Sequence, residues 1–323
     1  MKENWIILEG GLGNRMRVAA SAYAMTRRAG VPMRVLWTSQ WGMRCRFDEL
    51  FKAPSEGTEG AEGAFIRDAT GFERLLFARP TAKNLHLPRL LQRLRYRHII
   101  YAPQIWHLNQ AHFDYAAWFR QGDTLMTAYR DFCPWTPDDL RLLFQPNDEV
   151  QRLIDERTSA FSAYTIGLHI RRTDHQQAID ESPLELFFEA VDQEIENYNK
   201  ILSPTEILPP RGGDREGPGT GLRIYLATDD EATKTSLRNR YGSRVITSPA
   251  EATRDNTDGI RDALVEMYAL SRTRHIYGSA GSTFSPIAAC LGDVPITILQ
   301  RDGKGTIDLL CTRNDTTNSY TDE

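Results

Sequence analysis

The chain has 323 residues and a formal net charge of −4, with 41% hydrophobic and 25% charged residues. These values are typical of a soluble globular protein long enough for two domains, and the charge does not favour a nucleic-acid partner. The four cysteines form no CxxC pair, which argues against a structural zinc site and favours a reducing compartment. Because the sequence shows neither a secretory leader nor an apolar span of about 18 residues, we expect a cytoplasmic protein.

A glycine-rich turn follows the first predicted strand. Trp5 to Leu8 is a short apolar run, Glu9 to Asn14 reads EGGLGN, and apolar residues recur at helical spacing from Arg15 to Arg28. With a further apolar run at 33–37, this pattern predicts a βαβ unit whose turn brings backbone N–H groups close to a ligand. Met16 replaces the third glycine of a dinucleotide fingerprint, and no P-loop lysine follows. A turn needed only for tight packing is the alternative.

The middle of the chain carries fewer signals. Strands are expected at 99–105 and 124–129. The basic, leucine-containing stretch 88–98 is typical of an amphipathic helix, whose charged side is either a solvated face or a surface that meets a polar or anionic acceptor. Thr136 followed by proline predicts a helix start. We expect three regions: an N-terminal domain at 1–157, a C-terminal domain at 158–300, and a tail at 301–323 that can pack back on the N-terminal domain.

Strands and helices alternate regularly in the second half. The predicted strands are 163–170, 222–227, 244–247, 275–278 and 295–299, and the predicted helices between them are 183–202, 231–241, 258–272 and 285–291. Such alternation indicates crossover connections and a parallel α/β sheet. The Pro- and Gly-rich stretch 203–221 is interpreted as an insertion loop.

Polar loops follow three of these strands. The first is His169 to Asp174, with two adjacent arginines that are costly to bury unless they meet an anion. The second, Ala227 to Asp230, supplies carboxylates, and the third, Gly278 to Ser285, is a Gly/Ser-rich entry into a helix that suits a pyrophosphate. Because ligands of open α/β sheets bind outside the carboxyl ends of the strands, the three loops predict a nucleotide site. Arginines bridged to a nearby Asp, and aspartates that cap a helix, are the alternatives.

Four motifs in this order carry a family resemblance: GGLGN at 10–14, HIRRTD at 169–174, ATDD at 227–230 and STFS at 282–285. Together they resemble the superfamily of GDP-fucose-dependent fucosyltransferases, which includes α1,2-, α1,6- and protein O-fucosyltransferases and rhizobial chitooligosaccharide enzymes. The similarity covers the first 40 residues and most of 163–299.

The resemblance implies an α/β fold of the GT-B class, with two Rossmann-like domains facing across a cleft. The GDP-sugar donor would bind the C-terminal domain, and a glycan acceptor would approach from the N-terminal domain. It further implies transfer with inversion and no metal or other cofactor. The sequence agrees in lacking a DxD motif suited to Mg²⁺.

The resemblance also implies roles for individual residues. Arg171 would bind the β-phosphate and stabilise the departing GDP, His169 would hold the nucleoside, and Glu266 would accept from N1–H and N2–H of guanine. The other expected substrate-binding residues are Gly11, Gly13, Asn14, Arg15, Arg172, Asp229, Asp230, Ser282, Thr283, Phe284 and Ser285.

The general base that takes the acceptor proton is expected on the loop after the arginines. Ile179 stands at the position given by direct count, which leaves Asp174, Asp180 and Glu181 as the catalytic carboxylates to consider.

The sequence therefore predicts a glycosyltransferase that uses GDP-fucose or a related GDP-linked deoxysugar. A non-catalytic nucleotide-sugar or glycan-binding protein of the same fold is the alternative. An NAD(P) oxidoreductase is disfavoured by Met16 and by Thr38, which stands where the second strand would need to end in an acid.

Overall fold

The protein folds into two compact units. The computed structural model describes residues 3–40, 43–53, 65–78, 80–173, 176–202, 221–250, 252–301, 303–305, 307 and 309–312. Unit 1 contains the chain up to Val150, Thr253–Arg261 and the segment that begins at Leu309, and unit 2 contains the remainder. The predicted insertion loop lies, up to residue 220, outside the described residues. The expected division at 157/158 stays a prediction.

Unit 1 is built on a five-stranded parallel sheet of order β3-β2-β1-β5-β4. Its elements are β1 (Asn4–Leu8), α1 (Leu12–Ala29), β2 (Arg34–Trp37), β3 (Ile66–Asp68), α2 (Gly71–Leu76), α3 (Leu87–Arg95), β4 (His98–Ile100), α4 (Ile105–Gln110), α5 (Tyr115–Arg120), β5 (Thr124–Ala128) and α6 (Pro137–Leu143). The βαβ unit predicted for the N-terminus is confirmed.

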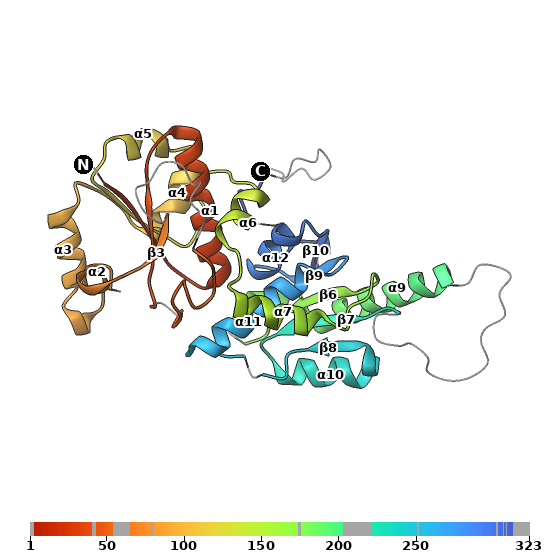
Figure 1. The fold of residues 1–323 in the computed structure, drawn as a ribbon. Helices are drawn as coiled ribbons and strands as arrows, with labels where there is room; N and C mark the ends of the chain where they lie inside the picture. The colour runs from red at the N-terminus through yellow and green to blue at the C-terminus, as the bar shows by residue number, and fades with distance from the viewer. Residues whose placement is uncertain are drawn as a thin grey trace. The chain divides into compact units, whose positions relative to one another are not determined.

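Helices cover both faces of this sheet. Trp5 and Ile7 of β1 pack with Leu76 and Phe77, which places α2 and α3 on one face. Figure 1 shows α1 on the opposite side of the strands from α2 and α3. Thr136 caps α6 as predicted, because its hydroxyl accepts from the Asp139 N–H at 3.3 Å.

The strand expected at 99–105 is wrong beyond Ile100. Residues Ala102–Gln104 form a 3₁₀ turn, and α4 begins at Ile105. Pro103 explains the early end of the strand, because it has no N–H to donate to a neighbouring strand.

Unit 2 contains a six-stranded sheet of order β11-β10-β9-β6-β7-β8, in which only the β10–β11 pair is antiparallel. Its elements are β6 (Ile166–Ile170), α8 (Gln176–Glu181), α9 (Leu184–Leu202), β7 (Ile224–Thr228), α10 (Glu231–Tyr241), β8 (Val245–Thr247), α11 (Thr257–Leu270), β9 (Ile276–Ser279), α12 (Phe284–Gly292), β10 (Ile296–Gln300) and β11 (Gly303–Lys304), with α7 (Asp148–Thr158) leading into it. The first residues of α11, up to Arg261, belong to unit 1. The predicted alternation of parallel strands and helices is confirmed.

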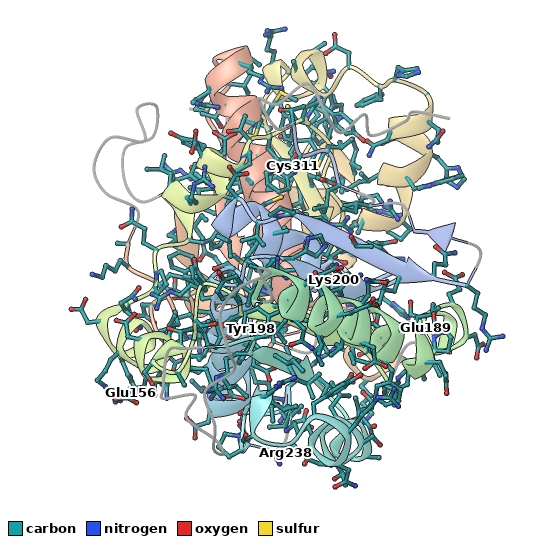
Figure 2. The ribbon with its side chains drawn as sticks, turned by 90° about the vertical axis from the view of Figure 1, so that its right-hand side faces the viewer. Glu156, Glu189, Tyr198, Lys200, Arg238 and Cys311 are labelled. Carbon is teal, nitrogen blue, oxygen red and sulfur yellow. The ribbon has the colours of Figure 1, made fainter. Side chains whose placement is uncertain are left out.

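Alternate residues of β6 face different helix layers. Three residues of β6 pack against Phe187 and Tyr198 of α9: Ile166, Leu168 and Ile170. Tyr198 is labelled in Figure 2. Gly167 faces the other way, where an added Cβ would lie 2.8 Å from Leu270 Cδ2 of α11. His169 is on that same side, which determines its surroundings in the site.

The last described segment belongs to unit 1. The backbone N–H of Trp135 donates to the Leu310 carbonyl at 3.0 Å, and that of Thr312 donates to the Trp135 carbonyl at 2.8 Å. Asp131 completes the join, since its Oδ2 accepts from both the Leu310 N–H and the Trp135 indole. No helix of the described residues combines the length and hydropathy needed to cross a membrane.

Candidate functional site

Three polar loops of unit 2 meet because β9, β6 and β7 are neighbours in the sheet and run parallel. The backbone N–H of Arg171 donates to Ser279 Oγ at 3.1 Å, which joins the loops after β6 and β9. The backbone N–H of Arg172 donates to Asp229 Oδ1 at 2.8 Å, which joins the loops after β6 and β7. The structure therefore brings together the three loops that the sequence analysis singled out.

His169 forms a neutral support beneath these loops. Its Nδ1 lies 3.3 Å from Ser285 Oγ, and its ring stacks on Phe284 with centroids 4.8 Å apart and planes inclined by 21°. Burial and the charge of Arg171 lower the pKa of His169 to about 3. The imidazole is therefore uncharged at neutral pH and acts by packing and hydrogen bonding.

The two adjacent arginines have different surroundings. The Arg172 guanidinium donates to the carbonyls of Ile179 and Ser182, at 3.3 and 2.9 Å, so it holds the C-terminal end of α8. Arg171 Nε lies 3.9 Å from Asp229 Oδ2, at the outer limit of an ion pair, and its side chain is 17% exposed. The Arg171 side chain therefore stays partly open to solvent beside Asp229.

Asp229 and Asp230 also have separate tasks. Asp229 accepts from the Thr173 hydroxyl at 2.7 Å, in addition to the Arg172 N–H. Asp230 caps α10 by accepting from the N–H and the hydroxyl of Thr233. Burial opposes ionisation of Asp230, but these hydrogen bonds outweigh it and lower its pKa.

Glu266 of α11 is a buried carboxyl group. Glu266 is 8% exposed, and no hydrogen bond to its carboxyl group is found among the residues that the structure describes. Burial raises the pKa of Glu266 to about 8. Its charged neighbours are Asp262, which raises this pKa further, Arg157 and Lys234, which oppose the rise, and Asp229. A ligand that donates hydrogen bonds would satisfy this group.

The loop after β9 leads into α12. Ser282 Oγ accepts from the Phe284 N–H at 3.3 Å, and Thr283 is the residue before the first turn of the helix. Ser285 is fully buried beneath them against Gly278, where an added Cβ would lie 2.3 Å from Ser285 Oγ. Ser285 therefore packs under the loop, whereas Ser282 and Thr283 lie at the helix N-terminus, which attracts anions.

Two of the candidate bases lie on α8. Asp180 is exposed, and Glu181 is half-buried with its carbonyl accepting from the Arg301 N–H at 2.9 Å. Asp174 lies outside the described residues.

The glycine motif of unit 1 forms the expected turn between β1 and α1. Gly10 adopts φ +80°, a conformation that favours glycine, whereas an added Cβ at Gly11 would meet nothing within 4 Å. Arg15 is fully buried, and its guanidinium donates to the carbonyls of Gly10, Thr38 and Gln40 at 2.7–2.8 Å. Arg15 therefore supports the turn.

A cavity of about 460 Å³ lies beside this turn within unit 1. Its polar wall includes Glu9 and Asn14, and the Arg89 guanidinium stacks on the Tyr101 ring at 5.1 Å. The buried Gln92 fixes that wall by accepting from the Tyr101 hydroxyl at 3.1 Å and donating to the Leu76 carbonyl at 2.8 Å. Aromatic faces beside a carboxylate, amides and a guanidinium suit a sugar ring with its hydroxyls.

The sequence analysis named Asn14 of this cavity, and offered the stretch 88–98 as one of two interpretations, but it did not identify the cavity as a whole. The cavity is assembled from β1, β5, α3 and a 3₁₀ turn, which are far apart in the sequence. A signal was present in Gln92, a polar residue on the side of α3 that also carries the buried Pro88.

Comparisons with known proteins find similarity in three-dimensional structure but not in sequence. Neither protein-family models nor curated proteins match the sequence. The NodZ α1,6-fucosyltransferase soaked with GDP-fucose is similar to the chain with a TM-score of 0.56 and 20% identity, covering 95% of this chain and 100% of that one. NodZ from Bradyrhizobium matches 92% of this chain and 96% of its own at a TM-score of 0.54 and the same identity.

The chain has the fold of these fucosyltransferases. A mutant of Arabidopsis thaliana FUT1 in complex with GDP, at 16% identity and a TM-score of 0.55, covers 92% of this chain and 70% of its own. POFUT1 without ligand, at 10% identity and a TM-score of 0.51, covers 93% of this chain and 98% of its own. The predicted fold class, α/β of the GT-B type with two Rossmann-like units, is confirmed, and so is the resemblance to the fucosyltransferase superfamily at the level of the fold.

Proposed function

We propose that the protein is a glycosyltransferase that transfers fucose, or a related deoxysugar, from a GDP-sugar to a glycan acceptor. The hydrogen-bonded convergence of three loops around Arg171 carries this proposal. The similarity of the fold to enzymes that bind GDP or GDP-fucose supports it.

The donor would bind unit 2. Arg171, whose Nε lies 3.9 Å from Asp229 Oδ2, would bind the β-phosphate of the donor, since a guanidinium and a phosphate form strong, charge-assisted hydrogen bonds. Ser282 and Thr283 at the start of α12 would add donors to the diphosphate. Phe284 and Ser285 would act indirectly, by positioning His169 beneath the nucleotide.

Guanine would be recognised by Glu266. Because its pKa is raised to about 8, Glu266 would release its proton as guanine binds, and its carboxylate would then accept from N1–H and N2–H of guanine together. No hydrogen bond to the Glu266 carboxyl is found in the described part of the chain. Arg172, Asp229 and Asp230 would maintain the shape of the site through the loop and helix contacts described above.

The acceptor would bind unit 1 through the cavity beside the glycine turn. Asn14 lines this cavity, Gly11 and Gly13 belong to the turn and first helical residues beside it, and Arg15 holds the turn from beneath. We propose a direct displacement at the anomeric carbon with inversion and without a metal. Among the described residues, no group of three or more His, Cys, Asp or Glu side chains is arranged to hold a metal ion.

In this mechanism the acceptor hydroxyl loses its proton as it attacks, and the bond to the β-phosphate oxygen breaks. Arg171 would stabilise the negative charge that develops on GDP, an effect of about 3–4 kcal/mol for a well-placed donor. Asp174, Asp180 and Glu181 are the proposed candidates for the base, and Glu9, the carboxylate that lines the cavity, is a fourth.

Calorimetric titration tests this proposal. Wild type should bind GDP and GDP-fucose at least about tenfold more tightly than UDP-glucose, with GDP-mannose defining the contribution of the sugar. Arg171→Ala should weaken GDP binding by about tenfold or more, whereas Arg238→Ala, a control for an exposed arginine of unit 2, should not change it. Equal binding of all four ligands would refute a GDP-sugar site.

Turnover separates the enzyme from its alternative, a non-catalytic binding protein of the same fold. Wild type should slowly hydrolyse GDP-fucose in the absence of an acceptor, and Arg171→Ala should lower that rate by about a hundredfold or more. Tight GDP-fucose binding with neither hydrolysis nor transfer across a glycan panel would favour the binding protein.

A further inference from the structure

The outer side of α2 and α3 exposes apolar side chains. Of the eleven large hydrophobic side chains that are exposed among the described residues, six lie between residues 72 and 94: Phe72, Leu75, Leu85, Leu87, Leu90 and Leu94. Four of these six are more than half exposed. A soluble domain rarely leaves such a group uncovered without a binding partner.

The exposed leucines of α3 form one stripe. Leu87, Leu90 and Leu94 are spaced by three and four residues, so they share a side of the helix. Other residues of the same segment, Leu91 and Tyr96, pack against the sheet. The stripe is therefore not needed for the core of unit 1 and faces outward.

The connection between the helices projects a further apolar side chain. Leu85 is 88% exposed, and its backbone has φ +51°. His86 follows at φ +53°, so two successive non-glycine residues occupy the left-handed region, which is unfavourable for both. The turn at Leu85 and His86 is unfavourable for the backbone and also exposes the Leu85 side chain to water. We interpret this exposed leucine as part of a binding surface.

The segment that carries this apolar stripe is basic. Between residues 74 and 113 the chain has no Asp or Glu but has seven Lys and Arg, at 74, 79, 83, 89, 93, 95 and 97, although its net charge is −4. Lys83 and Arg93 are exposed, and no carboxylate pairs with either of them within the described ranges. The partner of this surface must therefore be anionic as well as apolar.

We propose that this surface, residues 71–78 and 80–97, docks on a bilayer that contains anionic lipids. Exposed leucines would enter the interface between headgroups and acyl chains, while Lys83, Arg93 and Arg97 would meet lipid phosphates. A second copy of the chain would bring two such positively charged surfaces together, which like charge opposes. A polyanion without apolar groups would leave the leucines in water.

Vesicle sedimentation tests this proposal on the full-length protein. Wild type should pellet with phosphatidylcholine vesicles that contain phosphatidylglycerol at least about tenfold more than with phosphatidylcholine alone, and high salt should reduce this binding. The double variants Leu90→Ser/Leu94→Ser and Lys83→Glu/Arg93→Glu should each reduce it by about tenfold or more.

Matched controls come from unit 2. Ile201 is 61% exposed, and Arg238 is exposed on α10 (Figure 2), so Ile201→Ser/Arg238→Glu makes comparable changes elsewhere on the chain. This control should retain wild-type vesicle binding, and thermal unfolding should show that all variants are folded.

Several outcomes would overturn the proposal. The proposal would be wrong if wild type did not bind anionic vesicles at low salt. It would also be wrong if the leucine variant and the charge variant both bound these vesicles as well as the control variant does. Light scattering that shows a wild-type dimer, which Leu90→Ser/Leu94→Ser converts to a monomer, would assign the surface to a second copy of the chain instead.

Discussion

The carboxylate of Asp229 accepts from the backbone N–H of Arg172 at 2.8 Å and from the Thr173 hydroxyl at 2.7 Å. Through these two bonds, the loop after β7 fixes the loop after β6. The position of Arg171 therefore depends on a residue that precedes a different helix. This dependence leads to a first prediction.

Asp229→Ala should destabilise the protein and weaken donor binding together. It leaves the Arg172 N–H without its acceptor, which costs about 1–3 kcal/mol when the group is buried. Urea unfolding and GDP titration would measure both effects. The control is Asp192→Ala, which removes an exposed ion pair with Arg240 and an exposed hydrogen bond from the Tyr241 hydroxyl, and should cost less than about 1 kcal/mol. Equal effects of the two variants would contradict the assigned role of Asp229.

Glu266 predicts a pH dependence of stability. Its pKa is raised from 4.5 to about 8, so the folded protein binds this proton more tightly than the unfolded chain does. Stability should therefore be retained below pH 4.5 and decrease as the pH rises from 4.5 to 8. Glu266→Gln should remove that decrease and be more stable than wild type by ~2 kcal/mol or more at pH 9.

Unfolding free energies measured at several pH values would test this expectation. Glu189→Gln changes an exposed carboxyl group on α9 (Figure 2) and should leave the pH profile unaltered. If wild type and Glu266→Gln have parallel pH profiles, the buried carboxyl does not titrate as described.

Gly278→Ala should disrupt the donor loop. The added methyl group would lie 2.3 Å from Ser285 Oγ and displace the residue that contacts His169. We expect a loss of about 1–3 kcal/mol of stability, as in other overpacked cores, and weaker GDP binding. Gly11→Ala is the matched control, because its Cβ would meet nothing within 4 Å and its φ is −75°. A Gly278→Ala protein as stable as Gly11→Ala would refute the close contact.

Arg15→Leu should destabilise unit 1. The substitution keeps an apolar stem but leaves three carbonyls, those of Gly10, Thr38 and Gln40, without their donor. A loss of roughly 3 kcal/mol is expected in chemical denaturation. Arg28→Leu, an exposed position on the same helix, should change stability by less than about 0.5 kcal/mol. A loss confined to activity would instead place Arg15 on the substrate.

The sequence alone was sufficient for much of the fold, because its signals were local. Hydrophobic periodicity located β6 to β10 and α9 to α12 of unit 2 but missed α8 and β11, and the Thr136–Pro137 pair located a helix start. The strand at 99–105 was overextended because the apolar pattern continues past Pro103 into α4. There the proline was the more reliable signal.

The sequence predicted which loops form the candidate site, but not which side chains of those loops hold the backbone in place. Sequence order indicated that Arg171 and Arg172 lie at a strand end, yet only the structure shows that Arg172 holds backbone carbonyls. The same holds for Arg15, whose burial depends on Thr38 and Gln40 from another turn. Such contacts join segments that no local pattern connects.

The return of residues 309–312 to Trp135 constrains the order of events during synthesis. Unit 1 obtains the partner of the Trp135 backbone only when residue 312 has left the ribosome, long after β5 and α6 have emerged. Until then, Asp131 lacks the Leu310 N–H as a donor. The N-terminal unit must therefore wait, incompletely closed, while unit 2 is translated, and a nascent chain arrested before residue 309 should remain sensitive to proteases at 131–135.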